Sequence, residues 1–222
     1  MSEIFNDTSE NDHFSHKEFT PLRTDAFRFS PAEKREKIQH YFHAIMETLG
    51  LDTNDDSLKD TPKRVAKMYV DEIFGGLLPE NEPKSSVFDN HYKYNQMLVE
   101  KNITVYSTCE HHFLPIIGVA HVAYISNGVV IGLSKINRIV QYYARRPQVQ
   151  ERLTMQIVQA MKKAVNTNDV ACVIDAKHLC VASRGIQDTA STTLTAELSG
   201  CFKESADTRK EFLNYLGLDL KI

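Results

Sequence analysis

The sequence predicts an α+β fold, with an antiparallel sheet, helices on one side of it and a helical region before it. Residues 30–76 carry apolar side chains at helical spacing, whereas residues 98–125 alternate apolar and polar side chains. Two helical segments then separate these strands from further strand-like runs. Helices segregated from a mainly antiparallel sheet define the α+β class. A chain of 222 residues accommodates one such domain with an appendage.

Residues 1–29 are expected to form a variable, mobile arm outside a single domain that spans residues 30–222. The arm is polar, has more acidic than basic residues and has no sustained apolar period. Within the domain we expect a helical part, residues 30–76, and a catalytic part from about residue 97 to residue 222.

The helical part is expected to contain two helices. Ser30-Pro31-Ala32-Glu33 combines an N-cap, a proline at the first helical position and a capping-box glutamate. The apolar stripe of this first helix, which should pack against another surface, consists of Ile38, Tyr41, Phe42, Ile45, Met46 and Leu49. Thr61-Pro62 starts the second helix and Gly75-Gly76 ends it. Residues 77–96 are expected to be a connecting loop.

The remaining elements follow from the change of period. Strands are predicted around residues 98–105 and 118–125, and later over residues 169–181 and 189–198. Helices are predicted over residues 134–145 and 148–165, with Pro147 breaking them apart, and a last helix over residues 208–216.

Composition narrows the classes of function. No apolar run approaches the about 20 residues of a membrane helix, and the acidic start does not resemble a secretory signal, so we expect a cytoplasmic protein without a membrane partner. The formal net charge of −3 argues against bulk binding of nucleic acid. One local basic segment is compatible with an anion site or with a solvated helix face, and contains Lys135, Arg138, Arg145, Arg146 and Arg152 beside Glu151.

Thiols and imidazoles occur together in two places. Cys109-Glu110-His111-His112 follows a predicted strand, and His178-Leu179-Cys180 is expected on a strand, where residues two apart share a face. Sulfur and nitrogen donors suit zinc better than magnesium or calcium. Three protein ligands would leave a position for water, as in catalytic sites, and four would make a structural site; the residues alone allow both. The other two cysteines, Cys172 and Cys201, are interpreted as buried hydrophobes.

Two further groups are suited to binding a nucleotide. Ser134, Lys135 and Arg138 share one face near a predicted helix N-terminus, where a phosphate would be stabilised, although an ordinary amphipathic helix has the same pattern. The Glu151 carboxylate can accept from two adjacent donors, as on the Watson–Crick edge of guanine, or be a plain surface residue.

The combination of motifs strongly resembles the GTP cyclohydrolase I family. The resemblance runs from about Asp55 to about Leu213 and leaves the N-terminal arm outside. It rests on Asp56-Ser57-Leu58 with residues 61–68, Cys109 to Phe113, Val130 to Arg138, Arg146 to Thr154, and His178 to Cys180 with Arg184-Gly185.

The resemblance implies a tunnelling-fold (T-fold) protomer that hydrolyses GTP to 7,8-dihydroneopterin triphosphate and formate, the first step of tetrahydrofolate and pterin biosynthesis. Zinc is held by Cys109, His112 and Cys180, which favours the catalytic type of site. His178 and His111 transfer protons, and Gln150 and Glu151 recognise guanine. The residues that match the triphosphate-binding side of the family's site are Lys135, Arg138, Arg184, Arg64 and Ser134. Ser134 is also expected to be a catalytic residue. Active sites lie between subunits of a toroidal homodecamer of two pentamers.

Two alternatives make different predictions. Another tunnelling-fold enzyme, acting on a different pterin or deazapurine, would carry a free, reactive cysteine without the paired His-x-Cys ligands. A binding module with a structural zinc, such as a nucleotide sensor, would need no proton-transfer residues and would tolerate loss of His111 or His178.

Overall fold

The computed structural model describes residues 20–84 and 87–217, so most of the predicted arm lies outside the described residues. Helix α1 (Pro31–Thr48) begins as predicted: Oγ of Ser30 accepts from the backbone N–H of Glu33 at 3.3 Å, and the Glu33 carboxylate accepts from the backbone N–H of Ser30 at 2.8 Å. The Glu33 pKa is lowered by the hydrogen bonds from Ser30. The capping box therefore sets where the helix starts.

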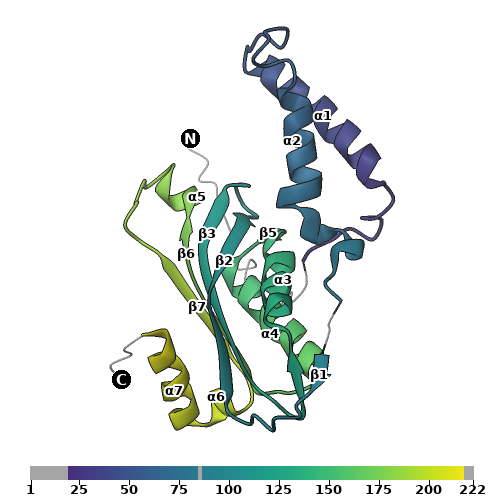
Figure 1. Ribbon diagram of the computed structural model, residues 1–222. Helices are drawn as coiled ribbons and strands as arrows, with labels where there is room; N and C mark the ends of the chain where they lie inside the picture. Colours follow the sequence, from purple (N-terminus) through teal and green to yellow (C-terminus); the bar gives the residue numbers. More distant parts are fainter. Residues whose placement is uncertain (1–19, 85–86, 218–222) are drawn as a thin grey trace, which may run out of the picture.

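Helices α1 and α2 (Thr61–Lys67) lie side by side and project from one end of the molecule (Figure 1). Helix α2 continues as a π-helical turn, η1 (Met68–Ile73), and then as a 3-10 turn, η2 (Gly75–Leu77). Of the apolar stripe predicted for α1, Met46 is buried, but Tyr41, Ile45 and Leu49 are 62%, 51% and 71% exposed. Among the residues that the structure describes, much of this stripe has no surface to pack against.

The Gly75-Gly76 pair ends the helical region as predicted, and Gly76 also joins it to the rest of the domain. Its N–H donates to the carbonyl of Arg145 at 2.9 Å, and its carbonyl accepts from Nε of Arg146 at 2.8 Å. A Cβ at Gly76 would lie 2.0 Å from the carbonyl oxygen of Tyr142, whereas one at Gly75 would meet only the Asn81 amide, at 3.6 Å.

We therefore expect Gly76→Ala to lower the free energy of unfolding by about 1–3 kcal/mol, the usual range for overpacking. Gly75→Ala is the matched control and should change it by less than about 0.5 kcal/mol. Urea denaturation of both variants measures the difference. Equal midpoints for the two variants would contradict the close approach at Gly76.

The predicted loop over residues 77–96 is more structured than expected. It contains a 3-10 turn, η3 (Pro79–Asn81), and a strand, β1 (Val87–Asp89), which pairs antiparallel with β4 (Val129–Ile131). Val87 lies opposite Ile131, more than forty residues along the chain. The local sequence could not indicate this strand because its partner is distant in sequence.

The main sheet has the strand order β5-β2-β3-β6-β7. Strands β2 (Met97–Cys109), β3 (Pro115–Ile125), β6 (Val170–His178) and β7 (Thr193–Leu198) are antiparallel neighbours, as predicted. The short β5 (Pro147–Gln148) runs parallel to the end of β2, which places Gln148 opposite Cys109.

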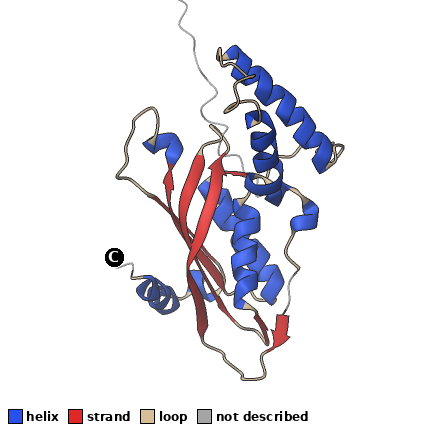
Figure 2. Cartoon of the chain, turned by 45° about the horizontal axis from the view of Figure 1, so that its top comes forward, coloured by secondary structure: helices blue, strands red, loops and turns tan. Residues whose placement is uncertain are grey.

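Helices α3 (Leu133–Ala144) and α4 (Gln150–Val165) pack together on one face of this sheet (Figures 1 and 2). Their apolar sides meet alternate residues of the strands, such as Val105, Val122 and Ile174, in the larger core. Helices α6 (Cys201–Glu204) and α7 (Ala206–Leu216) place Phe202 and Phe212 against the opposite face. The predicted one-sided arrangement thus describes α3 and α4, while the C-terminal helices cover part of the second face.

No helix within the described ranges is both long enough and apolar enough to cross a membrane.

Candidate active site

Three sulfur and nitrogen donors converge at one end of the sheet. Cys109 is the last residue of β2, His112 lies in the turn after it, and Cys180 lies in the short helix α5 (Leu179–Ala182) after β6. One potential ligand atom from each residue lies within 4.8 Å of the others. The turn is closed by the N–H of Phe113, which donates to the Cys109 carbonyl at 2.9 Å, and Phe113 adopts a φ of 53°.

The expected position of Cys180 needs correction. Strand β6 ends at His178, and Cys180 belongs to α5 rather than to the strand. The rule that residues two apart share a strand face therefore does not apply to this pair. The start of α5 instead brings the Cys180 thiol toward Cys109. Burial raises the Cys180 pKa, and hydrogen bonding and charge repulsion from Cys109 raise it further, while Arg184 opposes the shift.

The donor set fits zinc, since Cys and His are the ligands that zinc prefers. Among the described residues, His178 is not part of the group, so three protein donors are assembled rather than four. Three ligands with one position open is the pattern of catalytic zinc sites.

His178 lies beside this group and is held by Gln150, the first residue of α4. Nε2 of His178 and Oε1 of Gln150 are 2.8 Å apart. The amide nitrogen of Gln150 points at the carbonyl oxygens of Ile174 and Thr193, at 3.1 and 2.8 Å, and at Oγ1 of Thr195. The amide orientation is thus determined by its acceptors, which leaves Oε1 to accept from Nε2–H of His178.

The surroundings of His178 also affect its charge. Burial lowers its pKa, and the nearby Glu151 carboxylate partly opposes this shift. Gln150 is only 2% exposed. The predicted site residues near the three metal donors are therefore Gln150, Glu151, His178 and Arg184. Gln150 and Glu151 lie close to His178, and Arg184 lies close to Cys180.

His111 lies between a metal donor and a carboxylate. Its Nδ1 is 3.8 Å from Sγ of Cys109, and its Nε2 is 3.9 Å from Oε1 of Glu110. Its side chain is 54% exposed, so it can meet a bound molecule.

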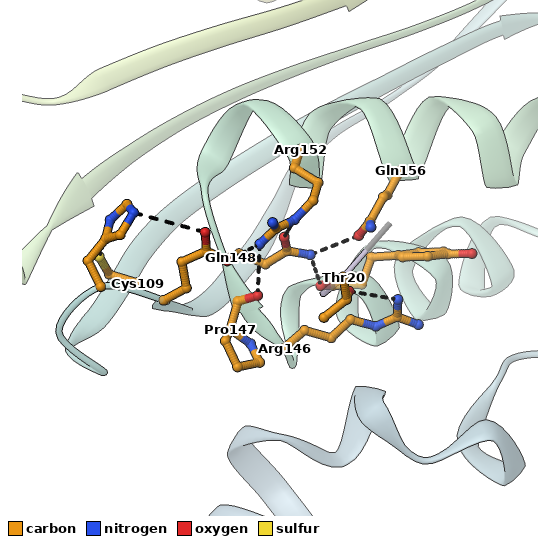
Figure 3. A network of polar contacts seen from close by, with 10 residues as sticks. Thr20, Cys109, Arg146, Pro147, Gln148, Arg152 and Gln156 are labelled. Carbon is orange, nitrogen blue, oxygen red and sulfur yellow. Dashed lines mark hydrogen bonds and ion pairs between the residues drawn. The ribbon is translucent and has the colours of Figure 1, made fainter. Parts of the chain in front are cut away.

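One feature of the site was missed by sequence reasoning. Glu110 forms an ion pair with Arg152 of α4, and Arg152 is linked through Gln148 to Gln156 (Figure 3). The sequence places Arg152 in the local basic segment and does not indicate its partner. A glutamate beside a cysteine ligand was a usable signal, but its partner lies 42 residues away.

The basic segment divides into different roles. Arg152 is buried, and Arg146 lies 4.5 Å from the ring centres of both Tyr142 and Tyr143, so both are structural cations. Lys135, Arg138 and Arg145 line a cavity of about 570 Å³, and its other charged lining residues are Asp71, Glu80, Glu82 and Lys84. The anion-site interpretation therefore applies to only part of the segment.

Four predicted residues are not brought to the metal donors within one chain. Ser134, Lys135 and Arg138 occupy the N-terminal half of α3, whereas the C-terminal end of α3 leads into β5 and the Cys109 edge. At 1.5 Å per residue, the 12-residue helix separates its ends by about 18 Å. Arg64 lies on α2, where it donates to the Ser57 carbonyl and to Oγ1 of Thr61.

The fold and the donor cluster together define an α+β protein with three residues that could hold a metal ion, and their donor types are those that catalytic zinc sites use. A model of the GTP cyclohydrolase I family matches residues 38–217. The chain belongs to the GTP cyclohydrolase I family, whose protomers have the T-fold.

Relatives named GTP cyclohydrolase 1 match nearly the whole chain. The Flavobacterium johnsoniae protein is 65% identical over 218 residues, which cover 98% of this chain and 97% of that protein. The Aeromonas salmonicida protein is 55% identical over 197 residues, or 89% of each chain. The Vibrio cholerae protein is 54% identical over 187 residues, covering 84% and 86%.

Proposed function

We propose that this protein hydrolyses GTP to 7,8-dihydroneopterin triphosphate and formate, using zinc, as the first step of tetrahydrofolate and pterin biosynthesis. The observation that carries the proposal is the convergence of Cys109, His112 and Cys180 to within 4.8 Å, in a chain that matches the family over residues 38–217. The reaction is a hydrolysis and needs no redox cofactor.

Cys109, His112 and Cys180 are the residues that would hold zinc. When bound, zinc makes water more acidic and so supplies the nucleophile that opens the imidazole ring of guanine. The protein holds these donors at the ends of β2 and β6, where backbone pairing makes the site rigid.

His178 protonates the ring nitrogen as the ring opens, and His111 serves as the second proton-transfer residue. The hydrogen bond from Nε2 of His178 to Gln150 leaves Nδ1 as the nitrogen available to the substrate. His111, being exposed, moves protons between the ring and solvent. Histidine is the side chain most often used in general acid–base catalysis, and the Glu151 carboxylate partly opposes the lowering of the His178 pKa by burial.

Glu151 accepts from two adjacent N–H groups of guanine, which distinguishes this base from adenine. The Oε1 atom of Gln150 has two lone pairs. One accepts from His178, and the other can accept a hydrogen bond from guanine. Arg184 binds the negatively charged side of the nucleotide from the segment after α5.

Ser134, Lys135, Arg138 and Arg64 bind the triphosphate from neighbouring copies of the chain. Ser134 and Lys135 lie at the N-terminal end of α3, and the length of this helix, about 18 Å, supports the proposal for these two residues. We propose a homo-oligomer, a toroidal decamer of two pentamers with active sites between subunits. The exposed Tyr41, Ile45 and Leu49 on α1 are consistent with a helix that is covered on assembly.

The test is to supply GTP to the purified protein with and without a zinc chelator. We expect a dihydropterin absorbance band and equimolar formate, both lost on chelation and restored by zinc. The chain has no tryptophan, which leaves the near-ultraviolet window relatively clear. If the assembled, zinc-loaded protein bound GTP but left it unchanged, the sensor alternative would be favoured.

A further inference from the structure

Glu110 stands between two of the proposed zinc ligands in sequence and has a side chain that zinc also accepts. Carboxylate oxygens are common zinc ligands, together with cysteine sulfur and histidine nitrogen. A fourth protein ligand would fill the position that a catalytic site leaves for water. Yet among the described residues the donor group contains Cys109, His112 and Cys180 without Glu110.

The Glu110 carboxylate is turned away from this group by Arg152. Its Oε2 accepts from a terminal nitrogen of the Arg152 guanidinium, and the Arg152 side chain is only 7% exposed. A buried guanidinium needs a counter-charge, so loss of either partner would be unfavourable for the other. The backbone N–H of Glu110 also donates to the Gln148 carbonyl, at 3.0 Å, which fixes the residue to β5.

Arg152 is in turn held in one orientation. Its Nε donates to Oε1 of Gln148 at 3.0 Å, and the same terminal nitrogen that meets Glu110 donates to the Pro147 carbonyl at 3.2 Å. Gln148 is fully buried, and its amide nitrogen donates to Oε1 of Gln156 and to the Tyr143 carbonyl, both at 2.9 Å. Figure 3 shows this network running from α4 to the turn that follows Cys109.

We propose that Arg152 is a positioning residue that keeps the Glu110 carboxylate out of the metal's coordination sphere. The ion pair thereby preserves a set of three ligands and one open position. This inference rests on the proposed zinc site. It explains why the turn supplies Cys109 and His112 as ligands but not Glu110.

The test uses protein loaded with cobalt(II), which accepts the same nitrogen and sulfur ligands as zinc and has a visible spectrum. In the wild type we expect thiolate-to-cobalt bands and a spectral change on adding azide, which binds at the open position. In Arg152→Met, the released carboxylate should occupy that position. The azide response should then fall at least tenfold, and zinc should leave to a chelator at least tenfold more slowly.

The double variant Arg152→Met with Glu110→Gln should recover the azide response, because an amide is a poor zinc ligand. Arg146→Met is the matched control: Arg146 belongs to the same segment but contacts Gly76 and two tyrosines, so its loss should leave the azide response unchanged. Circular dichroism and size-exclusion chromatography verify the fold and assembly of each variant.

If Arg152→Met does not fold, Arg152→Gln and Glu110→Gln provide the test. Arg152→Gln keeps hydrogen-bond donors but no charge, and should lose the azide response like Arg152→Met. Glu110→Gln should keep the response and bind zinc within threefold of the wild type. The inference is overturned if a folded Arg152 variant responds to azide normally, or if Glu110→Gln weakens zinc binding tenfold. Absence of thiolate-to-cobalt bands in the wild type would instead refute the proposed metal site.

Discussion

Replacing Cys180 with alanine is expected to remove both the metal and the GTP cyclohydrolase activity. One of only three donors is lost, and the remaining pair, Cys109 and His112, belongs to a single turn. Metal catalysis contributes several kcal/mol of transition-state stabilisation, and each ~1.4 kcal/mol is a tenfold change in rate. We therefore expect turnover to fall at least ~10³-fold, with a parallel loss of bound zinc measured by atomic emission.

Cys201→Ala is the matched control for this variant. Cys201 is also a partly buried thiol, but among the described residues it lies outside the donor group, and its backbone N–H donates to Oδ1 of Asp169 at 2.8 Å. The control should keep its zinc and its turnover. Full activity in a zinc-free Cys180→Ala protein would refute the proposed role of the metal.

Replacing His178 with alanine should separate chemistry from metal binding. A positioned acid–base group contributes typically ~10²–10⁴-fold to rate, so kcat should fall by that factor. The zinc content should stay near that of the wild type, because His178 is outside the donor group. The KM for GTP should change much less than kcat, which steady-state kinetics measures.

His121→Asn is the control for His178→Ala. His121 is another half-buried histidine whose pKa is lowered mainly by burial, but its Nδ1 accepts from the backbone of Asn102 within the sheet. Asparagine retains an acceptor, so turnover should be maintained. Normal turnover of GTP by His178→Ala would refute the proposed role of His178 in proton transfer.

Features that depend on neighbouring residues could be predicted from the sequence. The capping box at Ser30 and Glu33, the end of the second helix at Gly75-Gly76, and the break at Pro147 are all where the local pattern predicts them. The antiparallel pairing of β2 with β3 also followed from the period of two. The residue types Cys, His and Cys predicted a metal site because donor chemistry is a property of the side chain, and the structure brings these three side chains together.

Contacts between residues far apart in the sequence are defined by the folded structure. It placed Cys180 in a helical turn facing Cys109, paired β1 with β4, and separated Ser134 and Lys135 from the metal donors by the length of α3. It also brought Arg152 to Glu110 and Gln150 to His178. These contacts depend on how strands and helices that are tens of residues apart in the sequence pack together. A local sequence pattern carries no information about that packing. The ligand types could therefore be predicted from the sequence, whereas the geometry that orients them could not.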